Sequence, residues 1–371
     1  MALEIDAAEV EQLESSLFMD FLNHLINAEC NKLGIPPTRV KTSSELTSAE
    51  GGVDGRIEDD EQRADGRWIP HGLTVWQFKT GETNTRPSKL EKEAVKPGVL
   101  KALEEGGSYL VAIARRCDTS MRERRERSLR KAVAKKRLDP NRVTLLTADD
   151  LKKWASEHAS IVLLPYFRRP VGMCMRLEQW ERNPLHQGEF VADEARRRII
   201  DSVRSFLSQK TSPVHKRLLG RKGVGKTRLA MEALSALGIR ERAVYAQEPN
   251  HVPPEFWAWM RSSTVSSVTL AVDECDEHEA SKLMEQAEIC GGRVRLITIG
   301  TGEPFLSETS PNYLYVERLD SESMTKMIRD RFKGLSYEQT AWIERLTAGY
   351  PKLAVACGKV VEGRGEIDIA K

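Results

Sequence analysis

The chain has 371 residues, a length that fits two or three domains. Hydrophobic residues make up 40% and charged residues 30%, which excludes a disordered, collagen-like or small disulfide-stapled protein. The six scattered cysteines form no CxxC pair, a pattern typical of reduced thiols in a cytoplasmic protein. No apolar run approaches the roughly 20 residues that cross a bilayer, so no membrane association is expected.

The first 167 residues predict an α/β domain. Apolar residues over 10–33 recur at three- and four-residue steps, which indicates a helix ended by Gly34. Strands are expected at 73–79, 109–114, 143–146 and 161–164. Further helices are expected at 87–105 with an interruption at Pro97-Gly98, in the basic stretch after residue 114, and at 149–158.

The basic stretch contains nine Arg or Lys residues from Arg122 to Arg137, against Glu123 and Glu126. A basic face of this kind can neutralise the phosphates of a nucleic acid. A solvated helix with ion pairs between neighbouring turns explains the composition equally well. The pattern by itself leaves both interpretations open.

Two short motifs in this domain supply what a phosphodiester-cleaving site needs. The segment GGVDG at 51–55 places Asp54 at a turn, and Gln77 and Lys79 lie two residues apart, on one face of a predicted strand. A carboxylate holds Mg²⁺ against the phosphate, a second ligand completes the shell, and a lysine orients water and stabilises the developing charge. Asp54, Gln77 and Lys79 are therefore candidate catalytic residues, with Asp54 and Gln77 as metal ligands.

This arrangement resembles the PD-(D/E)xK restriction-endonuclease superfamily, above all its Mrr-like and related anti-phage branches, where the pattern often reads GGxD…QxK. The resemblance covers about residues 1–165 and implies a nuclease that acts on double-stranded DNA. Gln77 stands where the superfamily more commonly has Glu or Asp, which leaves one fewer charge on the metal. The missing carboxylate is expected from the first helix, at Glu11 or Glu14.

Residues 168–189 are expected to be a linker, because proline and glycine pairs interrupt the pattern there. A P-loop NTPase core is expected over 190–312 and a helical lid over 313–371. The first helix of this part is expected at 193–209. Its strands are expected at 217–219, 243–246, 268–272, 294–299 and 313–316.

The segment GRKGVGKT at 220–227 fits the pattern GxxxxGK[ST], between a short apolar strand and a predicted helix. Its glycines, Gly220, Gly223 and Gly225, let backbone N–H groups turn toward phosphate oxygens. Lys226 reaches the β- and γ-phosphates, and the Thr227 hydroxyl can bind Mg²⁺. The helix N-terminus adds its positive dipole. The motif therefore predicts a nucleotide site.

The strand at 268–272 ends in Asp273 and Glu274. In P-loop enzymes an Asp here holds the Mg²⁺ shell, and the adjacent Glu is suited to polarise the attacking water. With the strand at 243–246 between the two motifs, this resembles the additional-strand, catalytic-glutamate division of P-loop NTPases, which includes the AAA+ and STAND families. The resemblance covers about residues 190–371 and implies ATP and Mg²⁺ as cofactors.

The same resemblance implies three further roles. Thr298 or Thr301, at the end of the next strand, would sense the γ-phosphate. The segment GYP at 349–351 resembles the GxP motif of STAND NTPases, in which the proline, here Pro351, contacts the nucleotide from the lid. An arginine finger has several candidates: Arg318, Arg329 and Arg331.

Together these features predict an α/β protein with a restriction-endonuclease-like domain and a P-loop NTPase domain that carries a C-terminal helical lid. The predicted function is an NTP-regulated, Mg²⁺-dependent DNA endonuclease. The resemblance implies prokaryotic anti-phage defence, a homo-oligomer (a tetramer in antiviral STAND proteins) and a phage protein as trigger. One alternative is a DNA-binding ATPase, a motor or clamp with an inactive first domain, which Gln77 keeps open. Another is a modification-dependent restriction enzyme. The motifs do not distinguish ATP from GTP, because a P-loop binds phosphates.

Overall fold

The computed structural model describes residues 4–42, 51–59, 66–167, 173–182, 188–208, 214–236, 238–262, 267–302 and 312–364. The chain divides into two compact units. The first is Met1–Pro170 with Thr264–Ser266, and the second is Val171–Ser263 with Ser267–Lys371. None of the described helices combines the length and the apolar character needed to cross a bilayer.

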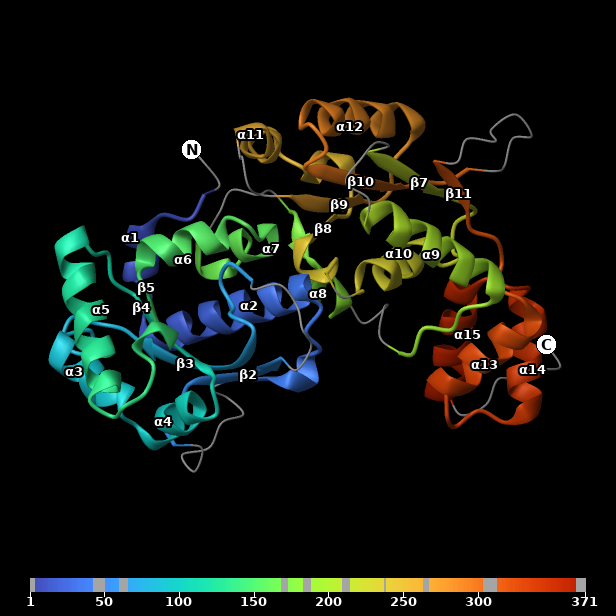
Figure 1. Ribbon diagram of the computed structural model, residues 1–371. Helices are drawn as coiled ribbons and strands as arrows, with labels where there is room; N and C mark the ends of the chain where they lie inside the picture. The colour runs from blue at the N-terminus through green and yellow to red at the C-terminus, as the bar shows by residue number, and fades with distance from the viewer. Residues whose placement is uncertain are drawn as a thin grey trace. The chain divides into compact units, whose positions relative to one another are not determined.

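The first unit is built on a five-stranded mixed sheet in the order β1-β2-β3-β4-β5 (Figure 1). Its strands are β1 (Val40–Thr42), β2 (Gly55–Asp59), β3 (Gly72–Lys79), β4 (Ser108–Ile113) and β5 (Val143–Leu146). The pairs β1–β2 and β2–β3 are antiparallel, whereas β3–β4 and β4–β5 are parallel. The helices are α1 (Ala7–Glu11), α2 (Ser15–Leu33), α3 (Pro87–Ala94), α4 (Pro97–Glu104), α5 (Thr119–Ala134), α6 (Ala148–Ala155) and α7 (Ala159–Val162).

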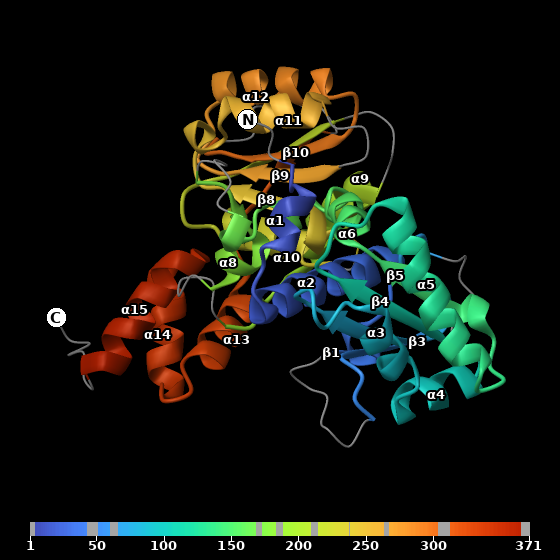
Figure 2. The same ribbon diagram turned by 90° about the vertical axis from the view of Figure 1, so that its left-hand side faces the viewer.

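Two apolar layers hold this sheet. On one face, α3, α4 and α5 pack against side chains such as Val75 and Val111. On the other face, Trp76 of β3 stacks on Trp154 of α6, with ring centroids 5.8 Å apart. Figure 2 shows α2 and α6 on this second side of the sheet and α3, α4 and α5 on the first. The sheet is therefore covered on both faces, which explains why burial is continuous along β4 and most of β3.

Most elements predicted for this unit are present, with three differences. The interruption predicted at Pro97-Gly98 is confirmed, since Pro97 starts α4. The helix predicted at 10–33 is two helices, α1 and α2, because the chain leaves helical geometry at Glu14, which caps α2. The strand predicted at 161–164 was wrong. That run is α7 and its exit, since a short apolar run fits a buried helix turn as well as a strand. Strands β1 and β2 were not predicted.

The second unit has a six-stranded sheet in the order β11-β7-β10-β9-β8-β6. The strands are β6 (Met175–Arg176), β7 (His215–Leu219), β8 (Ala243–Ala246), β9 (Val268–Val272), β10 (Val294–Ile299) and β11 (Tyr313–Tyr315). All neighbours pair in parallel except β6, which is antiparallel to β8. The helices are α8 (Leu177–Glu181), α9 (Glu194–Ser208), α10 (Lys226–Leu234), α11 (Pro254–Ser262), α12 (Glu277–Ile289), α13 (Ser321–Arg331), α14 (Tyr337–Thr347) and α15 (Pro351–Arg364).

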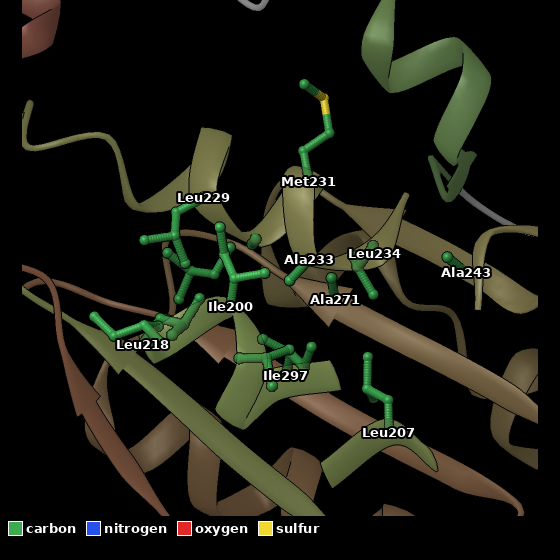
Figure 3. Packing of buried hydrophobic residues seen from close by; sticks show 14 of the residues in the cluster. Ile200, Leu207, Leu218, Leu229, Met231, Ala233, Leu234, Ala243, Ala271 and Ile297 are labelled. Atoms are coloured by element: carbon green, nitrogen blue, oxygen red, sulfur yellow. The ribbon is translucent and has the colours of Figure 1, made fainter. Parts of the chain in front are cut away.

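The core of this unit lies between the sheet and the pair α9 and α10. Figure 3 shows Leu229 and Leu234 of α10 and Ile200 of α9 packed against Leu218 and Ile297 of the sheet. Helices α11 and α12 lie on the opposite face of the sheet (Figures 1 and 2). A separate apolar cluster joins α13, α14 and α15, with Met324, Ile328 and Ile343 at its centre. These three helices lie in the segment for which a helical lid was predicted, and they are called the lid below.

The strand predicted at 243–246, between the two motifs along the chain, is present as β8. In the sheet β8 lies beyond β9, and β10 lies between the P-loop strand β7 and β9. One expectation about this unit needs correction. The expected linker 168–189 contains β6 and α8, and Trp180 of α8 stacks on Tyr245 of β8 with centroids 3.8 Å apart. These described residues are part of the second unit's sheet layer.

Candidate functional site

The loop between β7 and α10 carries the predicted phosphate-binding segment. Gly220, Gly223 and Gly225 have φ angles of +152°, +85° and +94°, a region that side chains rarely adopt. A Cβ on Gly220 would lie 2.4 Å from the Val316 carbonyl oxygen, so glycine is also required sterically. Lys226 begins α10, which places the helix N-terminus at the end of this loop. The conformation of this loop is therefore compatible with the predicted binding of phosphate.

The Lys226 ammonium is buried, and backbone carbonyls of the same loop accept its hydrogen bonds. Its Nζ donates to Gly220 O at 2.8 Å and to Arg221 O at 2.9 Å. Burial lowers the pKa of Lys226, and the charges of Asp273 and Glu274 oppose that shift. Among the described residues, this buried ammonium is held by neutral carbonyls and touches no counter-charge, which is what a nucleotide phosphate supplies.

Thr227 and Asp273 meet as the two motifs predicted. Thr227 Oγ1 donates to Asp273 Oδ2 at 2.6 Å, and Tyr245 OH donates to the same oxygen at 3.4 Å. Burial raises the pKa of Asp273, although the bond from Thr227 favours the carboxylate. A hydroxyl and a carboxylate at this distance fit a hard cation such as Mg²⁺. Both are the ligands expected at this position.

Glu274 is exposed at the end of β9, with φ of +49° and its N–H donating to Asp273 Oδ1 at 2.8 Å. A non-glycine residue in this region is strained. This backbone conformation turns the chain, so that Asp273 is buried and the adjacent Glu274 is open to solvent. That difference suits a metal ligand next to a general base.

The two threonines proposed as γ-phosphate sensors differ in their surroundings. Thr298 is fully buried, and its Oγ1 lies 2.7 Å from His215 Nε2 and accepts from Arg217 Nη1 at 3.4 Å. Burial, helped by Arg217, lowers the pKa of His215 to about 4. Thr301 follows β10 and is exposed. Thr301 therefore remains the better candidate for contact with a ligand.

The GYP segment of the lid lies against the P-loop. Lys352 N–H donates to Gly223 O at 3.2 Å, and a Cβ on Gly225 would lie 3.8 Å from Pro351 Cγ. The Arg318 guanidinium lies 4.8 Å from the Tyr350 ring centroid, and hydrogen bonds from Arg221 and Arg318 lower the pKa of Tyr350. Among the arginine-finger candidates, Arg318 is thus beside the P-loop, whereas Arg329 stacks on Tyr337.

In the first unit, Asp54 stands at the start of β2. Its N–H donates to Trp76 O, and its Oδ2 accepts from the Phe78 N–H at 2.7 Å. Gly51 and Gly52 have φ near +75°, and a Cβ on Gly51 would lie 2.4 Å from Gly98 N. The glycines let the loop run against the start of α4. This fixes Asp54 beside the C-terminal half of β3.

Gln77 is fully buried on β3. Its Nε2 donates to Gly52 O, and its Oε1 has no hydrogen-bond partner among the described residues. The hydroxyl of the neighbouring-strand residue Tyr109 is likewise buried without a partner in the described part of the chain. Because buried polar atoms are nearly always satisfied, the Oε1 of Gln77 is an oxygen donor available to a water molecule or a cation.

Lys79 is paired with a carboxylate that the sequence pattern did not reveal. Its Nζ lies 2.9 Å from Glu93 Oε2, and Lys96 Nζ lies 2.8 Å from the same oxygen. Burial opposes ionisation of Glu93, but the two lysines outweigh it and lower its pKa. Burial raises the pKa of Asp54, against the Phe78 amide and the charges of Lys79 and Lys96. Asp54 and Glu93 thus converge on the same lysines.

The first helices do not supply this carboxylate. Glu11 pairs with Arg115 at 3.3 Å and with Arg116 at 3.0 Å, and Glu14 is an exposed residue at the start of α2. Within the described residues, the carboxylate ion-paired to Lys79 is Glu93 of α3. No spacing in the sequence links Glu93 to Lys79, because the contact depends on how α3 packs beside β3.

A pocket of about 300 Å³ opens beside Lys79 and Glu93. Its lining also includes Thr80, Asn84 and Lys89. No group of three or more His, Cys, Asp or Glu residues in the described ranges is arranged to hold a metal ion. Two carboxylates and the unpartnered Gln77 Oε1 are nevertheless hard oxygen donors of the kind that Mg²⁺ prefers. The donor set fits Mg²⁺.

The basic stretch on and after helix α5 has features of both interpretations, an ion-paired helix and a basic face that could bind nucleic acid. Arg122 pairs with Glu126 at 3.0 Å, and the buried Arg125 donates to Thr85 O at 2.8 Å. The remaining basic residues of the stretch are exposed and form no ion pair within the described residues: Arg124, Arg127, Arg130, Lys131, Lys135, Lys136 and Arg137. One face is therefore structural, and the other is a cationic surface.

No family model and no curated protein matches the chain. Among solved structures, it is similar to the RuvB Holliday junction branch migration motor of Thermotoga maritima (16% identity, TM-score 0.37, 48% of this chain and 65% of that one). It is also similar to Aeropyrum pernix Orc1 in complex with DNA (16%, 0.39, 52% and 66%). A STAND protein with a tetratricopeptide repeat sensor from Pyrococcus horikoshii matches more weakly (15%, 0.27, 46% and 30%).

The chain thus spans about two thirds of the RuvB and Orc1 chains.

Proposed function

We propose that the chain is a nucleotide-regulated, Mg²⁺-dependent DNA endonuclease in which the second unit binds and hydrolyses ATP. The observation that carries the ATPase half is the contact of Thr227 with Asp273, next to the buried Lys226 that backbone carbonyls hold. Glu274 is the proposed general base for the attacking water. Nucleotide exchange would change the position of the lid through the hydrogen bond from Lys352 N–H to Gly223 O.

The observations that support the nuclease half are the ion pair of Lys79 with Glu93, the electrostatic interaction of Asp54 with both residues, and the buried, unpartnered Oε1 of Gln77 on the same strand as Lys79. Asp54, Glu93 and Gln77 would hold Mg²⁺, which when bound would polarise the scissile phosphate and acidify water. Lys79 would stabilise the charge that develops on the phosphate. The exposed cations of α5 would bind the DNA backbone without reading sequence.

The sequence resemblance supplies the biological setting of this proposal. It implies anti-phage defence in a prokaryote, with association of the NTPase units into a homo-oligomer and activation by a phage protein. Paired nuclease units would then cut both strands of DNA.

The test is cleavage of plasmid DNA with Mg²⁺, with and without ATP. Wild type is compared with Lys79→Ala, Glu93→Gln and Lys226→Ala, and with Lys101→Ala as a matched control. Lys101 is 72% exposed and lies outside both sites. Cleavage lost in the first two variants and in chelator supports the nuclease. Loss in Lys226→Ala as well makes the NTPase its switch. Cleavage that persists in Lys79→Ala sinks the nuclease assignment.

A second candidate function is a DNA-binding ATPase with a catalytically inactive first unit. Gln77 favours it, because its neutral amide leaves one fewer negative charge on the metal than a carboxylate would, and Lys79 is held by Glu93. This protein would bind DNA equally well in Mg²⁺ and in chelator. Its ATPase rate would respond to DNA, while no plasmid would be cut under any condition.

A further inference from the structure

Arg196, on the first turn of α9, touches both the P-loop and the base of the lid. It is 3% exposed. Its Nη2 donates to Val224 O in the P-loop at 2.9 Å and to Glu317 O, between β11 and α13, at 2.9 Å. Its Nη1 pairs with Asp193 Oδ2 at 2.6 Å. A single buried guanidinium therefore bridges two segments that are far apart in the sequence.

The contact with Val224 fixes the direction of a phosphate-binding group. In a planar trans peptide, the carbonyl of one residue and the N–H of the next point in opposite directions. With the Val224 carbonyl held toward Arg196, the Gly225 N–H must point away from it. Gly225 has φ of +94°, so without this anchor glycine could adopt another backbone conformation at little cost. Arg196 removes that freedom.

The contact with Glu317 ties the same guanidinium to the hinge of the lid. Around Glu317, Val316 N–H donates to Leu219 O at 2.7 Å, and Leu319 N–H donates to Gly349 O at 2.9 Å. Lys352 N–H, at the other end of the GYP segment, donates to Gly223 O. A shift of the P-loop peptide is therefore passed to the hinge through this buried side chain, in addition to the backbone bond from Lys352 to Gly223.

We propose that Arg196 is a positioning residue that holds the P-loop peptide in its phosphate-binding orientation and couples it to the lid hinge. The inference rests on the proposed nucleotide site and extends it to how occupancy is passed to the lid. Lysine cannot replace this residue, because one ammonium lacks the planar pair of donors that reaches two carbonyls and a carboxylate together. We therefore expect Arg196→Lys to keep the positive charge but to lose the coupling between the P-loop and the lid hinge.

The experiment compares amide hydrogen exchange in the full chain for wild type, Arg196→Lys and Arg198→Lys. Arg198 is the matched control, because it lies on the same helix but is 76% exposed and pairs with Glu194 at the surface. The reporters are the amides of Val316, Leu319 and Lys352. Without nucleotide, Arg196→Lys should speed exchange at all three by about tenfold, whereas Arg198→Lys should match wild type.

With MgATP, Arg196→Lys should show a KM for ATP raised about tenfold with little change in kcat, a split that a general loss of folding would not give. The coupling would be overturned if all three amides of Arg196→Lys exchanged at the wild-type rate. It would also be overturned if exchange became faster only at the hinge amides or only at Lys352. If that variant does not fold, Asp193→Asn should speed the same three amides, and no change there is equally fatal. If wild type binds no ATP, the proposed nucleotide site is wrong. The exchange rates measured without nucleotide still test whether Arg196 couples the P-loop to the lid hinge.

Discussion

Thr227 and Asp273, which lie 46 positions apart in the chain, are joined by a 2.6 Å hydrogen bond from Oγ1 to Oδ2. The bond brings the last residue of the P-loop motif onto the first acid after β9. Since the Asp273 pKa is raised by burial, the carboxylate is held without a full counter-charge. A cation between these oxygens would relieve that cost, which makes this pair the natural place for Mg²⁺ in the second unit.

Glu274→Gln should separate nucleotide binding from hydrolysis. The Glu274 side chain is exposed, and the residue bonds to Asp273 through its backbone N–H, so the amide should leave the P-loop intact. Loss of a general base lowers the rate by about 10²–10⁴-fold. We expect unchanged ATP affinity by equilibrium binding and a hydrolysis rate reduced by about that factor. The control is Glu285→Gln on the exposed face of α12. A variant that hydrolyses ATP at the wild-type rate would remove Glu274 from the mechanism.

Much of the fold was predictable because its elements are strongly patterned. Strand β5, the start of α4 at Pro97 and the P-loop followed by a helix all came from apolar runs, proline and glycine. Strands β1 and β2 were missed because they are only three and five residues long and show little apolar periodicity. The run 161–164 was misjudged because four apolar residues fit two structures. The position of β10 between β7 and β9 depends on packing across the sheet, which no local pattern encodes.

The candidate sites divide in the same way. Residues within one motif, such as Lys226 and Asp54, could be found from spacing. Glu93 could not, because its role depends on α3 folding back beside β3, and the carboxylate was expected instead at Glu11 or Glu14. Arg196 is similarly invisible in the sequence, where it is one of three consecutive arginines in an amphipathic helix. Only burial distinguishes it from its neighbours.

Asp54→Asn should stabilise the metal-free first unit at neutral pH. A carboxyl whose pKa is raised by folding lowers stability above that pKa and costs nothing below its unfolded pKa. In chelator at pH 7, the variant should therefore melt a few degrees above wild type. The difference should vanish as the pH falls below about 4. Asp20→Asn, at a position 50% exposed, should show no such pattern.

Mg²⁺ should reverse this order if Asp54 is a ligand. The cation should raise the melting temperature of nucleotide-free wild type by more than that of Asp54→Asn, because both proteins keep the proposed Mg²⁺ ligands Thr227 and Asp273 of the second unit. Equal stabilisation of both proteins by Mg²⁺ would contradict the assignment of Asp54 as a metal ligand.

Reversing charge on the outer face of α5 should weaken DNA binding. Arg127 and Arg130 are exposed, and no ion pair to either is found in the described part of the chain. The double variant Arg127→Glu, Arg130→Glu should bind duplex DNA at least about tenfold more weakly at low salt. The plot of log affinity against log salt should become shallower by about 0.9 for each phosphate that the variant no longer neutralises. Fluorescence anisotropy with Lys101→Glu as control measures both. An unchanged slope would assign these arginines to a solvated surface.

Gly349→Ala should disturb the lid far more than Gly363→Ala, although both glycines adjoin or lie in α15. Gly349 has φ of +83°, and a Cβ there would lie 2.6 Å from Leu319 O and 2.8 Å from Arg318 Cβ. A Cβ on Gly363 would meet no described atom within 4 Å, so alanine there should be neutral or slightly stabilising. Because Gly349 O accepts from Leu319 N–H, the strain falls on the hinge that carries Tyr350 and Pro351 to the P-loop.

We expect a lower melting temperature and at least about tenfold weaker ATP binding for Gly349→Ala, measured by calorimetry. Equal behaviour of the two variants would mean that the lid contact does not contribute to nucleotide binding.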